Sequence, residues 1–357
     1  MEPVSPRSPE ARLRQAALAQ AEGRGRRVHG TGRARALAVL KRVAVGVYTD
    51  GFIHAGNLAY LAILSVFPFI IVAAAIASLV GQTEGGLQTL RAVLETMPPD
   101  VAALLEKPMQ DVIAARSGTL LWIGALIGLW SVGSFIETIR DIIRRSYGVQ
   151  VTTPFWEYRL ASAGLIIGTV LVMLLSFSAN VLLSAVQEFV VSRIPGADDI
   201  AGFVTLIRLV PAAILFGAFY ILFLVLTPGR YRARAYPKWP GALFVALWWV
   251  SVTALLPVTL ATLGGYGATY GSLAGVVVAL LFFFLIGMGV VIGAELNAAL
   301  AETPVPSQED VVAAVREEKA EVAAEAAHEA AVEKVEQEKI DQRHEKAATK
   351  EAEGKTE

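Results

Sequence analysis

The chain has 357 residues, 55% of them hydrophobic, a formal net charge of −1 and no cysteine. The lack of cysteine excludes a disulfide framework, a thiolate zinc site and a cysteine nucleophile. The apolar content favours a membrane protein whose outer surface meets lipid over a soluble domain of this length.

The N-terminal part is basic, with ten Lys and Arg against four Asp and Glu in residues 1–57. Residues 1–32 are rich in Arg, Gly and Pro and are expected to form a disordered arm without a secretory signal, because no apolar core precedes residue 37. In residues 33–57, Leu37, Leu40 and Ala44 recur at helical spacing among basic residues. This pattern predicts an amphipathic helix on the cytoplasmic leaflet, where anionic lipids would bind the arm. A plain extension of the first membrane span is the alternative.

Six later segments are apolar and long enough to cross a bilayer, which takes about 20 residues as a helix. They are continuously apolar rather than alternating, which favours helices over a barrel. The sequence therefore predicts an all-α, polytopic membrane domain at 58–300, with spans at 58–80, 118–136, 160–186, 202–227, 241–263 and 272–294.

Basic residues in the connecting segments predict the orientation of these spans. Four Lys and Arg lie in residues 137–159 and four in residues 228–240, whereas the alternate connections hold three, one and none. Every basic-rich segment then falls on one side, so both termini are expected in the cytoplasm. The outer connection, 81–117, should form two short helices divided by Pro98-Pro99-Asp100.

The C-terminal residues 301–357 are predicted to be a charged cytoplasmic tail. From residue 307 on, eight Lys and Arg stand against fifteen Asp and Glu, among many Ala. This composition favours a solvated or partly disordered helix over a coiled coil.

The segment GGYGATYGSLAG, Gly264–Gly275, resembles a potassium-channel filter in its glycines and tyrosines. A filter loop re-enters the membrane between a pore helix and a lining helix. Leu263 and Ser272, each bordering a full span, are too close in the chain to leave room for a pore helix. A tight outer turn is therefore expected here.

Four segments, in order, resemble the YihY/BrkB family of bacterial inner-membrane proteins. They are AGNLAYLAILSVFPF at 55–69, the stretch from Trp130 through IRDIIRRSYGV at 139–149, WPGALFVALWW at 239–249 and YGSLAGVVVALLFFFLIGMGVVIGAELNAAL at 270–300. Where members often have an Asn before the aromatic-Gly pair of the second segment, this chain has Arg144-Arg145-Ser146. The resemblance implies a six-span inner-membrane protein. It implies no settled activity, because the family's old label, ribonuclease BN, is regarded as a misassignment.

An enzyme is not expected. Metal-dependent hydrolysis needs several carboxylates or histidines at one site, and the four histidines are scattered. HExxH, Walker and GxSxG motifs are absent from the sequence. No cofactor, no metal and no nucleic-acid partner are predicted, since cytoplasmic positive charge beside a first span is the usual orientation signal.

Polar groups at membrane depth are the candidate functional residues, because burying them in lipid is costly. Arg208 would lie about 9 Å inside the outer end of the fourth span, at a depth similar to that of Asn180. The two could form a binding site for an anionic substrate. The alternative is an arginine that extends to the outer headgroups.

A second set of polar residues is predicted at the inner ends of three spans. It would form a cytoplasmic vestibule for a polar or amphiphilic solute, with Arg140 as a candidate partner of Glu295. Ordinary interfacial residues, paired locally along each helix, are the alternative. The set comprises His54, Asn57, Glu137, Arg140, Asp141, Glu295 and Asn297.

The leading hypothesis from the sequence is translocation or export of a solute, such as a lipid or envelope precursor. The second is a membrane scaffold that recruits envelope proteins or anionic lipid through the arm and tail. A membrane nuclease is the least favoured. Substrate, coupling ion and oligomeric state do not follow from the sequence.

Overall fold

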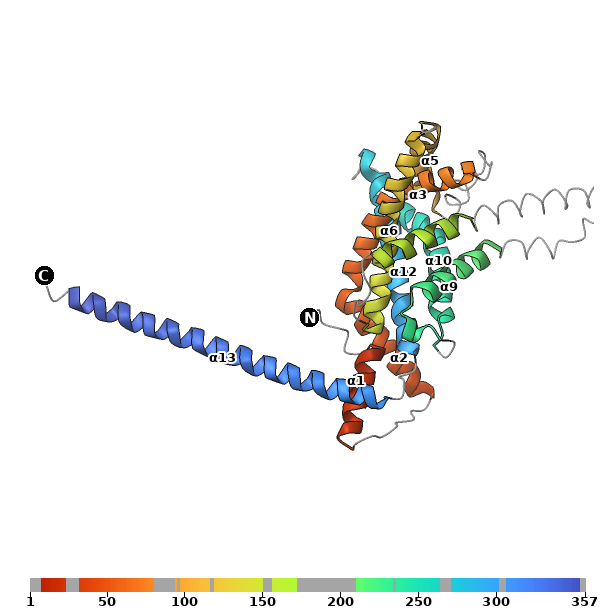
Figure 1. The fold of residues 1–357 in the computed structure, drawn as a ribbon. Coiled ribbons are helices and arrows are strands. Elements are labelled where there is room, and N and C mark those ends of the chain that lie inside the picture. Colours follow the sequence, from red (N-terminus) through yellow and green to blue (C-terminus); the bar gives the residue numbers. More distant parts are fainter. Residues whose placement is uncertain are drawn as a thin grey trace, which may run out of the picture. The chain divides into compact units, whose positions relative to one another are not determined.

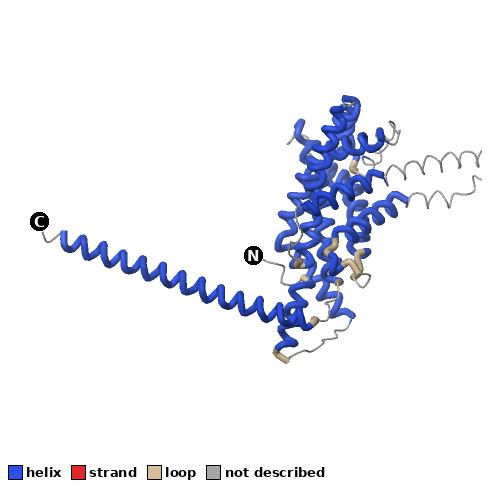
Figure 2. Tube along the Cα trace, viewed as in Figure 1, coloured by secondary structure: helices blue, strands red, loops and turns tan. Residues whose placement is uncertain are grey.

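The computed structural model describes residues 8–23, 32–79, 94, 97–115, 119–149, 156–171, 210–233, 236–263, 271–301 and 306–353. Every regular element within these residues is a helix (Figure 2), which confirms the all-α class. The chain divides into two compact units. The first comprises Met1–Glu10 with Gly30–Glu302, and the second comprises Ala11–His29 with Thr303–Glu357.

The first unit begins with a nearly unbroken helical stretch. It consists of α2 (Gly32–Gly46), a π-helical turn η1 (Val47–Gly51) and α3 (Phe52–Leu79). The long apolar helix thus starts six residues before the predicted span at 58, because Phe52 and Ile53 extend its apolar run. His54 and Asn57, expected ahead of the span, lie inside α3.

The remaining helices of this unit are labelled in Figure 1. Helix α6 runs eleven residues past the predicted span end at 136, because its charged C-terminal residues continue the helix. Pro99 opens α5 at the predicted proline break, a position that suits its fixed φ and missing N–H. A helix at 156–171 contains the start of the third predicted span. The elements are α5 (Pro99–Ala115), α6 (Thr119–Tyr147), α9 (Val210–Leu226), η3 (Gly229–Tyr231), α10 (Trp239–Leu263), η4 (Gly271–Leu273) and α12 (Ala274–Leu300).

Four helices of the described residues are long and apolar enough to cross a membrane, namely Phe52–Ile76, Trp122–Tyr147, Trp239–Thr262 and Ala274–Leu300. A shorter apolar helix occupies Ala212–Leu226. The predicted spans 160–186 and 202–227 lie partly outside the described residues, as does the predicted turn at 264–270. A polytopic helical membrane protein is therefore confirmed, whereas six crossings and their orientation stay predictions.

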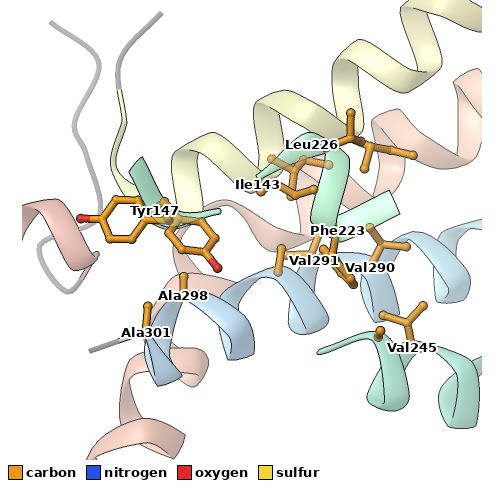
Figure 3. Close-up of a cluster of buried hydrophobic side chains, with 14 of the residues drawn as sticks. Ile143, Tyr147, Phe223, Leu226, Val245, Val290, Val291, Ala298 and Ala301 are labelled. Atoms are coloured by element: carbon orange, nitrogen blue, oxygen red, sulfur yellow. The ribbon is translucent and has the colours of Figure 1, made fainter. Parts of the chain in front are cut away.

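Helix α12 is the centre of the first unit. It packs against α3, α10, α2, α6 and α5, and 56% of its apolar stretch is buried, against 22–39% in the other three long helices. One buried cluster joins α12 to α6, α9 and α10 through side chains that include Ile143, Phe223 and Val290 (Figure 3). This apolar cluster holds the ends of α6 and α12, where the predicted inner residues lie.

The second unit contains α1 (Pro9–Ala21), apart from its first two residues, and α13 (Gln308–Glu353). Arg14 of α1 forms a bidentate pair with Glu321 of α13, at 3.1 and 2.7 Å. The arm expected to be disordered thus includes a helix. The reason is local, because the segment PEARLRQAALAQA consists largely of strong helix formers behind a proline.

Candidate functional site

The C-terminal half of α6 carries a continuous polar face. Gly133, Glu137, Arg140 and Arg144 follow one another at intervals of three or four residues, so they share one side of the helix. Ile139, Ile142 and Ile143 point instead into the buried apolar cluster. The helix at 156–171 covers the polar face, with Tyr158 and Arg159 in its first turn.

Arg159 reaches along α6 to the middle of that helix. Its Nε lies 3.2 Å from a carboxylate oxygen of Glu137, and one Nη donates to the Trp130 carbonyl at 2.9 Å and the Ser134 hydroxyl at 3.2 Å. The guanidinium also stacks over the Trp130 ring, 4.1 Å from its centroid. Glu137 is the first charged residue of α6 and lies ten residues before the last residue of that helix, Tyr147.

Arg140 and Arg144 form a second group with Tyr158, which we call the paired-arginine site. The guanidinium carbons of Arg140 and Arg144 lie 4.9 and 5.6 Å from the centre of the Tyr158 ring. Arg140 donates to the Tyr158 carbonyl at 3.4 Å, and Arg144 to the Tyr158 hydroxyl at 3.3 Å. Arg140 is 8% exposed, so two like charges meet at a largely buried place.

Asp141 pairs with arginines of its own helix. Its carboxylate accepts from Arg145 Nε at 2.7 Å and lies 3.7 Å from Arg144. These pairs at i,i+4 and i,i+3 are the ordinary interfacial contacts that formed the alternative to the vestibule. Glu137, Arg140 and Asp141 are therefore brought together, but each has a different partner.

Asn297 holds α12 to the start of α10. It is 1% exposed; its carbonyl oxygen accepts from the Gly241 N–H at 2.8 Å, and its amide donates to the Lys238 carbonyl at 3.0 Å. A Cβ at Gly241 would collide with the Gly293 carbonyl and with Asn297 itself. Glycine at 241 thus permits the close approach, and Asn297 accepts from the Gly241 N–H, one of the donors that the start of a helix leaves open.

The remaining residues of the predicted inner set, Glu295, His54 and Asn57, lie on two different helices, α12 and α3. The Glu295 carboxylate packs directly against Gly46 of α2, where any Cβ would collide with it, and Arg42 of α2 donates to the Ala299 carbonyl at 3.3 Å. His54 is half-buried and Asn57 is exposed. No ion pair between Arg140 and Glu295 is found among the described residues, where Arg140 donates instead to the Tyr158 carbonyl.

The predicted outer pair, Arg208 and Asn180, lies outside the described residues. No group of three or more His, Cys, Asp or Glu residues that could hold a metal ion occurs in the described part of the chain. The polar groups that the structure brings together around α6 are arginine, carboxylate and aromatic side chains.

Three functional candidates were missed by sequence reasoning. Tyr158 and Arg159 were treated as loop residues, although they immediately precede the apolar run at 160, where a helix N-terminus was the better inference. Lys238 was counted only as an orientation signal. It is 4% exposed and donates to the Ala233 carbonyl at 2.8 Å, and burial, followed by the positive charge of Arg232, lowers the pKa of Lys238.

Comparison with known proteins assigns the family. The model of the family described as Virulence factor BrkB matches residues 48–317. The putative ribonuclease-like protein YfkH of Bacillus subtilis is 28% identical over 70% of this chain and 90% of that protein. A UPF0761 membrane protein of Chromohalobacter salexigens is 28% identical over 71% of this chain and 60% of that protein. A UPF0761 membrane protein of Aeromonas salmonicida is 26% identical over 72% of this chain and 87% of that protein. No solved structure matches.

The family match and the apolar helices agree. The matched region runs from η1 into α13 and includes the four long apolar helices and the polar face of α6. The chain belongs to the virulence factor BrkB family of integral membrane proteins.

Proposed function

We propose that the chain translocates an amphiphilic solute, such as a lipid or a precursor of the cell envelope, across the bacterial inner membrane. The observation that carries the proposal is the Glu137–Arg159 ion pair between α6 and the helix at 156–171, whose side chains are 24% and 15% exposed. A charged pair that is mostly buried between two membrane helices is costly, and such charges often mark the path of polar groups. A purely structural contact between two membrane helices needs no charge, because apolar and small residues pack them equally well.

The surface of α6 suits an amphiphile rather than a wholly polar solute. The first half of the helix exposes Ile123, Leu126, Ile127 and Trp130, and these share a helix side with Glu137 and Asp141 further along. An acyl chain could lie along the apolar half while its headgroup follows the polar half. The predicted outer pair, Arg208 with Asn180, would receive the headgroup at the other side of the membrane.

The proposed topology has six crossings with both termini in the cytoplasm, and the crossings at 160–186 and 202–227 complete the four long helices. A reporter fused near Gln88 should be active only in the periplasm, and one at the C-terminus only in the cytoplasm. A cytoplasmic reporter at Gln88 would overturn this topology and the assignment of the polar half of α6 to the inner side.

Translocation can be tested in liposomes that contain the purified full chain and a fluorescent lipid in one leaflet. Glu137→Gln, which preserves shape and removes charge, should slow transfer at least about tenfold, the scale of a lost charge-assisted contact. Glu106→Gln is the matched control, because Glu106 is an exposed α5 residue that accepts from Gln110 of the same helix. Wild-type rates in the Glu137 variant, after correction for folded protein, would refute the proposal.

A scaffold is the second candidate, and α13 favours it. This helix is 46 residues long, or about 70 Å at 1.5 Å per residue, and its side chains from Glu317 to Ala324 are exposed. If the Glu137 variant keeps full cellular activity while deletion of residues 303–357 abolishes it, the scaffold replaces the transporter.

A further inference from the structure

The carboxylates nearest the paired-arginine site are occupied by other cations. Glu137 lies 3.2 Å from Arg159, and Asp141 accepts from Arg145 at 2.7 Å. Within the described residues, Arg140 has no carboxylate within ion-pair distance, and Arg144 has only Asp141 at 3.7 Å. The site therefore holds two guanidinium groups whose charge is largely uncompensated.

The hydrogen-bond donors of these two residues are also mostly unused. Arg140 makes one long hydrogen bond, at 3.4 Å, to the Tyr158 carbonyl, although a guanidinium carries five N–H groups. The buried Nε of Arg144 has no acceptor among the described residues. Buried donors without acceptors are uncommon in native proteins, and each is a reason to expect an unobserved partner.

A buried positive charge without a counter-charge is strongly unfavourable. Two such charges over one tyrosine ring would also repel each other, so a bound anion would relieve both costs. Guanidinium groups match the oxygens of phosphate through paired N–H donors, which is why arginine is preferred where phosphate is recognised. Tyr158 keeps the two groups on one side of its ring and so holds them in place for a shared ligand.

We propose that Arg140, Arg144 and Tyr158 form a binding site for a phosphate group, carried by the headgroup of an amphiphile. The proposal adds the chemical class of the substrate to the proposed transport function. Only the statement that an amphiphile carries the phosphate rests on that function. The site lies in the last two turns of α6, which ends at Tyr147. A headgroup can reach that level while its acyl chains remain in the lipid.

The test uses the purified full chain in an uncharged maltoside detergent, so that no lipid phosphate competes. Binding of three probes is measured by isothermal titration: short-chain phosphatidic acid, inorganic phosphate, and a fatty acid of matched chain length. We expect phosphatidic acid to bind most tightly. Inorganic phosphate should compete with it only weakly if the ligand is a lipid headgroup, and nearly as well if the source is free phosphate.

The variants separate the site from its surroundings. Arg140→Ala and Arg144→Ala should each weaken binding of phosphatidic acid at least about tenfold, since each removes charge-assisted hydrogen bonds. Arg145→Ala is the matched control, because Arg145 is paired with Asp141 and is more exposed; its affinity should stay within about twofold of wild type. Tyr158→Phe, which keeps the ring and frees an N–H of Arg144, should bind at least as tightly as wild type.

Several results would overturn the proposal. They are unchanged affinity in both alanine variants, equal binding of the fatty acid, or a loss in Arg145→Ala as large as in Arg140→Ala. If an alanine variant fails to fold, Arg140→Lys decides, because it keeps the charge but loses the planar fork and should weaken binding by about three- to tenfold. Phosphatidic acid that binds but is not translocated in liposomes would refute the transport function and leave the phosphate site standing.

Discussion

The ion pair between Glu137 and Arg159 gives the sharpest prediction, an asymmetry between its two halves. In Glu137→Gln, Arg159 keeps the Trp130 carbonyl at 2.9 Å, the Ser134 hydroxyl at 3.2 Å and the Trp130 ring at 4.1 Å. In Arg159→Gln, the Glu137 carboxylate loses the one cation that the described residues place within ion-pair distance. We therefore expect the second variant to unfold far more easily.

The magnitudes follow from burial. The Arg159 and Glu137 side chains are 15% and 24% exposed, so solvent screens the pair only partly. Replacing Arg159, which leaves the Glu137 carboxylate without this counter-charge, should lower the free energy of unfolding by about 3 kcal/mol, the lower end for a broken buried pair. Replacing Glu137 should lower the free energy of unfolding by about 1 kcal/mol, since Arg159 keeps its neutral acceptors and the indole ring. The double variant should cost less than the sum, with a coupling free energy of about 1–2 kcal/mol.

The assay is equilibrium unfolding of the full chain in maltoside detergent, followed by tryptophan fluorescence, for the two single variants and the double variant. Glu106→Gln serves as the control and should stay within about 0.5 kcal/mol of wild type. Equal losses in the two single variants, or a coupling energy near zero, would show that the pair does not act as the contacts indicate.

Three further predictions concern separate parts of the chain. Asn297→Ala should destabilise the protein by about 1–3 kcal/mol in the same unfolding assay, because it leaves the buried Gly241 N–H without its acceptor and removes one of the two donors to the Lys238 carbonyl, which keeps the Ala242 N–H. A loss of substrate binding with full stability would contradict this structural role. Arg140→Met should raise the unfolding midpoint in detergent free of anionic lipid, since it removes an uncompensated buried charge; a lowered midpoint would indicate a structural arginine instead. In the second unit, the hydrogen bond from Arg14 lowers the pKa of Glu321 from its usual 4.5. A lowered pKa in the paired state means that the pairing stabilises above pH 4.5 and is lost as the pH falls through the lowered value. Spin labels on α1 and α13 should therefore move apart only in acid or at high salt, and separation that sets in above pH 6 would exclude this pair as the cause.

Much of the helical framework was predictable from apolar length alone. Helices α10 and α12 begin within two residues of the predicted spans at 241 and 272, because long apolar runs between polar segments leave few other solutions in lipid. The start of α3 at Phe52 was missed because its first turn contains His54 and Asn57, whose polarity hid the continuing helix. The helix in the N-terminal arm was missed for a related reason, since overall composition outweighed a local run of helix-forming residues.

The candidate site was predictable only within one helix. The spacing of Glu137, Arg140 and Asp141 placed them on neighbouring positions of α6, and the structure does so. Their partners come from a different helix, and no periodicity in α6 reveals that Arg159 reaches Trp130. Asn297 was assigned to the site because topology put it at the same level. A buried asparagine where two helices cross at glycines is more simply explained as a hydrogen bond between those helices. The sequence does not show that crossing, because only the structure brings Gly241 against Gly293.

If the chain translocates a solute as proposed, the contrast between two helix contacts predicts which one opens. Between α10 and α12, Gly241 lies against Gly293, Asn297 bonds the backbone, and the Trp248 indole donates to the Leu285 carbonyl at 2.8 Å. Separating these helices would expose tightly packed apolar surface and strand buried groups. Between α6 and residues 156–171 the contacts near Arg159 are polar, and water or a headgroup could replace them at little cost.

Hydrogen–deuterium exchange tests this difference without any substitution. Amides in peptides that cover 156–171 should exchange faster than those that cover 281–300, and the difference should grow when a transported amphiphile is added. The reason is that a polar contact can open to water while a close-packed one stays shut. Equal protection of the two segments, or faster exchange in 281–300, would place the moving contact elsewhere and remove the role given to the Glu137–Arg159 pair.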